Sequence, residues 1–262
     1  MQKLTNKIVF ITGASSGIGK ACAEQFAAAG AKLILTARRI ERLEDLSSEL
    51  KKKYNTEILC INLDVQDQKQ VMSTIQQLPK DTKNIDILIN NAGKALSTAK
   101  IQEGEINDWE DMINTNIKGL LYITRAILPG MVERNAGHII NISSTAGRHN
   151  YPNGNVYCAT KHAVRSLSES MRLDLCGTAI RVTDIAPGMV HTEFSEVRWK
   201  GDKAKSDAFY EGFTPLQAGD VAETIVFCAT RPAHVDIAEL VIYPTDQASP
   251  TIVHKRNQEV TK

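Results

Sequence analysis

The sequence carries almost no net charge: 31 lysine and arginine residues are balanced by 30 aspartate and glutamate residues in a chain of 262. A chain without a charge excess has no global field that would draw nucleic acid or an anionic membrane surface. No apolar run approaches the roughly 20 residues that span a bilayer, and no apolar signal segment precedes the first predicted strand. We therefore expect no nucleic-acid partner, no membrane partner and no export signal.

Cysteine and histidine form no pattern typical of a disulfide framework or a metal site. The five cysteines are widely spaced and include no Cys-x-x-Cys pair, and the six histidines lack metal-ligand spacing. We expect free thiols in a reducing compartment, which favours a cytoplasmic location, and no bound metal.

Short apolar runs alternate with helical stretches along the whole chain, and 42% of the residues are hydrophobic. The order predicts βαβ units, a parallel sheet and one doubly wound α/β domain of Rossmann type over residues 1–262. Pro129-Gly130 is expected to bend or interrupt one long helix. The polar segment 193–213 is expected to be a mobile excursion over a site. Strands are predicted at 8–11, 32–36, 57–63, 85–89, 138–142, 180–185 and 240–243, and helices up to 29 and at 40–53, 71–78, around 109, 116–134, 155–175 and 218–229.

A glycine-rich turn follows the first predicted strand and opens the first predicted helix. Its residues are Gly13, Ser15, Ser16, Gly17, Ile18 and Gly19, and its glycine spacing is G-x-x-x-G-x-G. Glycine permits a tight turn and close backbone approach, and the helix N-terminus offers unpaired N–H groups to a pyrophosphate. The turn therefore predicts phosphate binding, whereas a loop without a ligand is the structural alternative.

The end of the second predicted strand distinguishes between dinucleotide cofactors. An acidic residue there is typical of NAD-binding folds because it holds the ribose hydroxyls. This chain instead has Arg38 and Arg39. Two guanidinium groups suit a 2′-phosphate, which favours NADP over NAD. The alternative is that both arginines are ordinary surface residues of the next helix.

Tyr157 and Lys161 are four residues apart in a predicted helix, and Tyr157 follows Ser144 by thirteen residues. Such residues lie on one helical face. A phenol is a poor acid or base at neutral pH, and a neighbouring ammonium group favours the phenolate and lowers its pKa. Taken alone, such a pair is more often a surface contact than a catalytic pair. Whether it is catalytic in this chain therefore depends on the other motifs.

Together, these motifs resemble the short-chain dehydrogenase/reductase family over essentially the whole chain. The family order is matched by the glycine-rich turn, Asp64, Asn90-Asn91-Ala92-Gly93, Asn116, Ser144, Tyr157, Lys161 and Pro187-Gly188. The resemblance implies that Tyr157 is the acid/base, that Ser144 binds the substrate oxygen, and that Lys161 holds the nicotinamide ribose and lowers the tyrosine pKa. Asn116 would anchor a water molecule that links Lys161 to solvent.

The same matching implies the remaining cofactor contacts. Asp64 and Val65 would meet the adenine, and Asn91 would meet the adenosine ribose. The carboxamide end would be met by Pro187, Gly188, Val190 and Thr192, and Ala92 and Gly93 are further expected cofactor contacts. The family also implies a homo-oligomer, often a tetramer built on the helices at 116–134 and 155–175.

Within the family the chain resembles the NADP-dependent 3-hydroxy acid dehydrogenases that act on serine and allo-threonine. The similar segments include 128–131, 154–157, 192–195, 197–201 and 244–250. The function implied is interconversion of a secondary alcohol and a ketone in a small hydroxy acid. Arg198 is the expected carboxylate ligand among the cations of its segment, although loop charges are commonly solvated. A reductase of other ketones or aldehydes, a non-catalytic NADP-binding regulator and a flavodoxin-like binding module are the alternatives.

Overall fold

The centre of the molecule is a seven-stranded parallel sheet in the order β3-β2-β1-β4-β5-β6-β9. A computed structural model describes residues 4–256. The strand order reverses next to β1, as in doubly wound folds, so the predicted α/β Rossmann-type class is confirmed. The strands are β1 Ile8–Thr12, β2 Lys32–Ala37, β3 Ile58–Asn62, β4 Ile87–Asn90, β5 Gly137–Ile142, β6 Ile180–Pro187 and β9 Glu239–Ile242.

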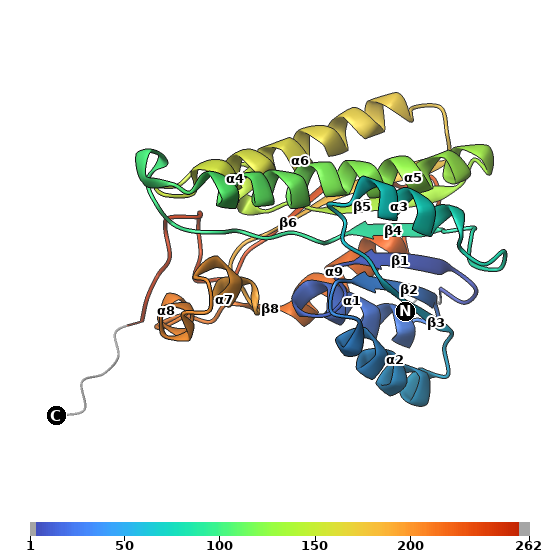
Figure 1. Ribbon diagram of the computed structural model, residues 1–262, viewed down its shortest axis with the longest axis horizontal. Helices are drawn as coiled ribbons and strands as arrows, with labels where there is room; N and C mark the ends of the chain where they lie inside the picture. Colours follow the sequence, from blue (N-terminus) through green and yellow to red (C-terminus); the bar gives the residue numbers. More distant parts are fainter. Residues whose placement is uncertain (1–3, 257–262) are drawn as a thin grey trace.

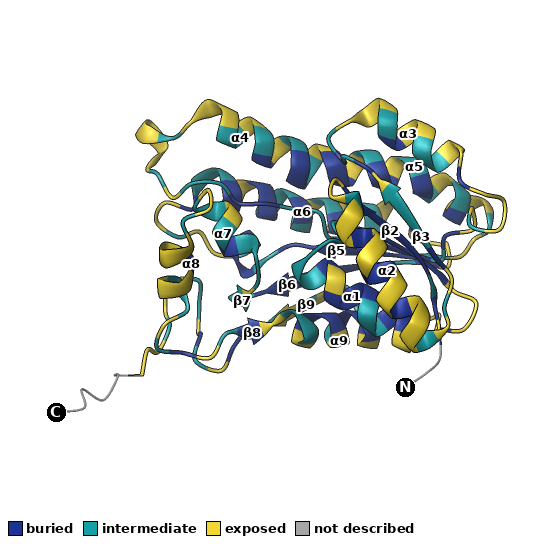
Figure 2. Ribbon diagram, turned by 60° about the horizontal axis from the view of Figure 1, so that its bottom comes forward, coloured by how far each residue is buried: buried dark blue, intermediate teal, exposed yellow. Residues whose placement is uncertain are grey.

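Helices cover both faces of the sheet, as Figure 1 shows. One layer contains α1 Gly17–Ala28, α2 Ile40–Tyr54 and α9 Ala218–Ala229, and the other contains α3 Gln68–Gln76, α4 Ile106–Ile113, α5 Leu120–Glu133 and α6 Asn155–Asp174. Because both faces are covered, the inner strands are buried on both sides and read as nearly continuous apolar runs. Figure 2 shows this burial, with the strands dark and the outer helix faces exposed. Over residues 4–256, no helix is long and apolar enough to cross a membrane.

The helix that contains Pro129 is not interrupted, which corrects that part of the sequence prediction. Pro129 lies inside α5, which continues to Glu133. Its missing N–H would otherwise bond the carbonyl of Arg125, and both residues lie on the exposed face, where water can satisfy that carbonyl. The irregular turn falls earlier: Asn114–Gly119 is a π-helix, a form that frequently occurs at functional sites.

Segment 193–213 contains two short helices, α7 Phe194–Arg198 and α8 Lys203–Phe209. On either side of them, β7 Val190–His191 pairs in parallel with β8 Leu216–Gln217. The segment predicted as an excursion is therefore a folded flap, fastened at its base by two strands that the sequence patterns did not indicate.

Buried amides connect the sheet to the second helix layer. Asn90 Nδ2 donates to Thr124 Oγ1 at 3.0 Å and to Asn141 Oδ1 at 2.8 Å. Asn141 Nδ2 in turn donates to Ser168 Oγ at 2.9 Å. The ladder thus runs from α5 across β4 and β5 to α6. A buried polar group costs free energy unless it is paired, so these residues depend on each other.

Asn141→Ala should lower the free energy of unfolding by roughly 1–3 kcal/mol, because one Asn90 N–H group loses its buried acceptor. The measurement is denaturant unfolding. Asn84→Ala is the matched control, because Asn84 is exposed and such substitutions change stability by roughly 0.5 kcal/mol or less. Equal effects of the two substitutions would contradict a structural role for the ladder.

Candidate active site

A cavity of about 700 Å³ opens where the central strands end, and most of the predicted site residues line it. Carboxyl ends of parallel strands meet at one edge of a sheet, which is where doubly wound folds bind ligands. Of the site residues predicted from the sequence, Gly19 and Asn116 do not line the cavity. Those that do are Gly13, Ser15, Ser16, Gly17, Ile18, Arg38, Arg39, Asp64, Val65, Asn91, Ala92, Gly93, Ser144, Tyr157, Lys161, Pro187, Gly188, Val190, Thr192 and Arg198.

The glycine-rich turn has the backbone geometry that phosphate binding requires. Gly13 and Gly17 adopt positive φ angles of +66° and +54°, which favour glycine. A Cβ atom on Gly19 would collide with the carbonyl oxygen of Gly13 and with the side chain of Asn91. Gly19 therefore lets the turn pack closely and is not itself a wall of the cavity. No side chain caps the start of α1 at Ser16, so its first N–H groups remain free for an anion.

The two arginines after β2 differ in their contacts. Arg38 lines the cavity. Arg39 Nη2 donates to Ser15 Oγ at 3.2 Å and to Ser16 Oγ at 3.1 Å, so this guanidinium lies against the phosphate turn. A cationic rim beside a phosphate-binding turn fits a dinucleotide with an additional phosphate on its adenosine ribose.

Ser144, Tyr157 and Lys161 meet at the other end of the cavity. Ser144 precedes the short 3₁₀ turn Thr145–Gly147, and its Oγ accepts from the N–H of Ala146 at 3.1 Å. Tyr157 lies in the first turn of α6, with its ring 5.8 Å from that of Phe194. Lys161 lies one helical turn further, with Nζ 5.9 Å from the Tyr157 ring centroid.

Burial dominates the proton affinities of this pair. It raises the pKa of Tyr157 above its ordinary value, while Arg198 and a hydrogen bond from Ser144 oppose that rise. It lowers the pKa of Lys161 to about 8, against the attraction of Asp184. Lys161 Nζ donates to the carbonyl of Ile142 at 2.9 Å. The resemblance implied that Lys161 lowers the tyrosine pKa, but the net pKa of Tyr157 is raised, because burial outweighs the favourable charges around its hydroxyl.

Asn116 lies in the π-helix behind the cavity. Its Nδ2 donates to the carbonyl of Lys94 at 2.8 Å and to Thr160 Oγ1 at 3.0 Å, and its Oδ1 accepts from the N–H of Lys94 at 2.9 Å. The side-chain amide therefore holds the loop after β4 against α6, next to Lys161. This arrangement gives Asn116 a positioning role through both neighbours.

Arg198 is the cation of the flap that reaches the substrate end of the cavity. Its guanidinium lies 5.4 Å from the ring centroid of Tyr157 and 5.5 Å from that of Tyr151, and it donates to the Tyr151 hydroxyl. Its Nε is buried and has no partner among residues 4–256. By contrast, Lys200 pairs with Asp108 and Lys205 with Asp202, both outside the cavity lining.

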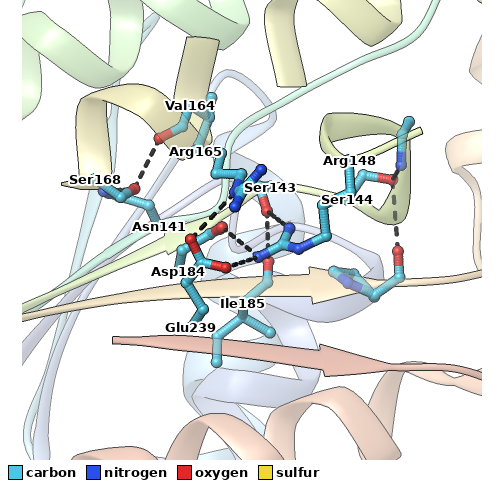
Figure 3. A network of polar contacts seen from close by, with 12 residues as sticks. Asn141, Ser143, Ser144, Arg148, Val164, Arg165, Ser168, Asp184, Ile185 and Glu239 are labelled. Carbon is cyan, nitrogen blue, oxygen red and sulfur yellow. Dashed lines mark hydrogen bonds and ion pairs between the residues drawn. The ribbon is translucent and has the colours of Figure 1, made fainter. Parts of the chain in front are cut away.

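Arg148, the other arginine near Ser144, points away from the cavity. Figure 3 shows its guanidinium between Asp184 and Glu239, at 3.0 Å from each carboxylate. The other terminal nitrogen of Arg148, Nη1, donates to Ser143 Oγ at 3.4 Å, and the Arg148 side chain is 11% exposed. Arg148 therefore fastens the turn after Ser144 to β6 and β9 and is not available to a substrate.

Some residues of the site carried no signal in the sequence. Tyr151 lies on the loop before α6 and lines the cavity, and Glu193 and Arg42 meet across 151 positions. Lys94 is buried with its Nζ 2.8 Å from Asp111, although lysine is normally exposed. Glu193 lay in the segment predicted as an excursion and in the similar stretch 192–195, but neither of these indicated its pairing with Arg42.

Comparisons with known proteins agree with this geometry. A family model described as short chain dehydrogenase matches residues 7–203. Sulfoacetaldehyde reductase 2 of Chromohalobacter salexigens is 50% identical over 242 residues, covering 92% of this chain and 95% of that protein. The NADP-dependent 3-hydroxy acid dehydrogenase of Schizosaccharomyces pombe is 44% identical over 257 residues, covering 98% and 99%. The closed form of a serine dehydrogenase complexed with NADP+ superposes with a TM-score of 0.89 at 47% identity, covering 95% and 100%.

The affinity for NADPH should fall as pH rises through about 8, because Lys161 then loses the proton that strengthens its hydrogen bonds to a ribose. Because a single proton is lost, the affinity should fall by at most about tenfold for each pH unit. Tyr151, Tyr157 and Cys158 keep their protons in this range, since burial raises their pKa values. Calorimetric titration measures the affinity. In Lys161→Met the binding should be weaker and independent of pH; a slope that persists in this variant would contradict the assignment.

Proposed function

Because the chain belongs to the short-chain dehydrogenase family, we propose that it is an NADP-dependent oxidoreductase acting on CH–OH groups. It interconverts an alcohol with the corresponding carbonyl compound, and its substrate is a small 3-hydroxy acid such as serine or allo-threonine. One observation carries this proposal: a single cavity joins the phosphate turn and its arginines to Ser144, Tyr157 and Lys161.

The residues divide the reaction between them. A bound NADP would take up hydride in the oxidation, and NADPH would supply it in the reduction. The glycine-rich turn, Arg38 and Arg39 would hold the phosphates, while Asp64, Val65, Asn91, Ala92 and Gly93 would contact the adenosine half. Pro187, Gly188, Val190 and Thr192 would contact the carboxamide half, and Lys161 would hold the ribose there; all these residues except Gly19, which lets the turn pack closely, line the cavity.

Tyr157 transfers the proton. In the reducing direction its hydroxyl donates a proton to the substrate oxygen as charge develops there, and in the oxidising direction it accepts one. Ser144 donates a second hydrogen bond to the same oxygen. The ammonium of Lys161 stabilises the phenolate that forms once the proton has left.

The substrate's acid group is bound by Arg198. Its buried Nε lacks a partner among the described residues, and the adjoining Tyr151 hydroxyl offers a further hydrogen bond. A guanidinium that is desolvated and already oriented is well suited to a carboxylate. Since Arg198 also adjoins the Tyr157 ring, a bound acid would place its neighbouring carbons beside the acid/base.

A second candidate is reduction of a small sulfonated aldehyde, favoured by the likeness to sulfoacetaldehyde reductase 2. In sulfoacetaldehyde one carbon separates the carbonyl from the sulfonate, and in a 3-hydroxy acid one carbon separates the alcohol carbon from the carboxylate. The two substrate classes therefore place an anion at the same position relative to the reacting carbon, and Arg198 would serve either one.

Arg198→Ala should lower kcat/KM for anionic substrates by about 10- to 100-fold, since a hydrogen bond to a charged group contributes roughly 1.5–3 kcal/mol. The loss should fall on KM, while uncharged alcohols and ketones change much less. The panel should contain serine, allo-threonine, sulfoacetaldehyde and uncharged analogues, each assayed with both NADP and NAD cofactors.

Lys203→Ala is the matched control, because Lys203 is an exposed cation of the same flap and does not line the cavity. It should leave every substrate unaffected. An equal loss for charged and uncharged substrates in Arg198→Ala would contradict the anion-binding role. Absence of turnover with the whole panel would favour a binding protein that uses the same fold.

We also propose that the chain works as one domain in a cytoplasmic homotetramer. Exposed apolar side chains on the helices predicted to form the interface support the assembly, namely Leu121 and Val132 on α5 and Leu173 on α6. The five free cysteines support a reducing compartment. Light scattering of the purified protein measures the number of subunits.

A further inference from the structure

Glu193 pairs with two arginines at the cofactor end of the cavity. Its Oε2 lies 3.1 Å from Arg39 Nη1, and its Oε1 lies 2.6 Å from Arg42 Nη1. Arg39 directly precedes α2 and Arg42 lies in its first turn, whereas Glu193 directly precedes α7. The two ion pairs therefore connect the end of β2 to the start of the flap.

Arg39 also contacts the phosphate turn, which places these ion pairs beside the expected phosphate site. Its Nη2 donates to the hydroxyls of Ser15 and Ser16 in the phosphate turn. This guanidinium is thus one of the two groups assigned above to the 2′-phosphate of NADP. In the free chain, a carboxylate of the same chain takes its other nitrogen.

A phosphate competes well for these arginines. It carries more negative charge than a carboxylate and has three strong acceptor oxygens. The ion pairs that it must replace are exposed: the side chains of Arg39, Arg42 and Glu193 are 46%, 47% and 38% accessible to solvent. Exposed pairs of this kind contribute little, so they can be exchanged at small cost.

We propose that Glu193 is a substitute anion, which the 2′-phosphate of NADP displaces from Arg39. The exchange rests on the proposed NADP dependence and adds a residue that sets cofactor specificity. NAD lacks this phosphate and leaves the ion pairs in place. Because Glu193 directly precedes α7, which carries Phe194 and Arg198, the exchange also releases the start of the helix that borders the substrate.

The test is calorimetric titration of the full chain with 2′-AMP and with 5′-AMP, which differ in the position of the phosphate. Glu193→Gln removes the competing charge, so 2′-AMP should bind about three- to tenfold more tightly, as expected for the loss of exposed ion pairs. The affinity for 5′-AMP should not change. NADPH and NADH should reproduce the same contrast.

Glu196→Gln is the matched control, because Glu196 lies in α7 and forms no ion pair with Arg39 or Arg42. It removes the same charge three residues further along the flap and should leave both affinities unchanged. If Glu193→Gln leaves 2′-AMP binding unchanged or weakens it, the exchange is wrong. An equal change in the affinities for 2′-AMP and 5′-AMP would also contradict the exchange. Glu193 would then shape the pocket without competing with the 2′-phosphate.

A different result would contradict the assignment of NADP as the cofactor. If the unmodified chain binds 5′-AMP as tightly as 2′-AMP, and NADH as tightly as NADPH, then the arginines do not select the 2′-phosphate. That result would overturn the NADP assignment and the exchange together. A clear preference for 2′-AMP that Glu193→Gln does not alter would overturn the exchange alone.

Discussion

The buried ammonium group of Lys161 is the interaction on which the arrangement of the site depends. It lies at the end of β5 and donates to the Ile142 carbonyl, which fixes the start of α6 against the sheet. Thr160, the preceding residue, accepts from Asn116, and Gly147 packs so closely on the Lys161 backbone that a Cβ atom there would not fit. Three elements therefore meet around Lys161: the turn that follows Ser144, the helix of Tyr157 and the π-helix of Asn116. Burial of a charge is costly unless it is compensated, and the nearby carboxylate of Asp184 offsets part of that cost.

Positive charge is concentrated at the two ends of the cavity. Arg38 and Arg39 lie beside the phosphate turn, and Arg198 lies beside Tyr157. The flap connects the two ends, because Glu193 contacts the first group and Arg198 lies five residues later in the same segment. In the proposed function, a dinucleotide phosphate and a small anionic substrate would meet opposite ends of one short helix. Such an arrangement would let a fold shared by many enzymes select both a cofactor and a substrate class.

Much of the fold could be predicted from the sequence, because short apolar runs such as 32–36 alternate regularly with helical stretches such as 218–229. Most of the motif residues line the cavity because the carboxyl ends of parallel strands meet at one edge of the sheet. Other features depend on contacts that no local pattern encodes. The uninterrupted helix at Pro129 follows from solvent exposure, and the burial of Arg148 by Asp184 and Glu239 follows from the pairing of β6 with β9. The meeting of Glu193 with Arg42 requires the folded flap.

The central claim is that Tyr157 transfers a proton in an NADP-dependent oxidation. The most direct measurement is the appearance of NADPH absorbance when a 3-hydroxy acid is mixed with the chain preloaded with NADP. The account predicts rapid formation of NADPH in the unmodified chain. In Tyr157→Phe the rate should fall by at least about 100-fold, as expected for loss of a general acid/base, while NADP affinity changes by less than about threefold. An unchanged rate in Tyr157→Phe, or a loss of NADP binding equal to the loss of rate, would contradict the account.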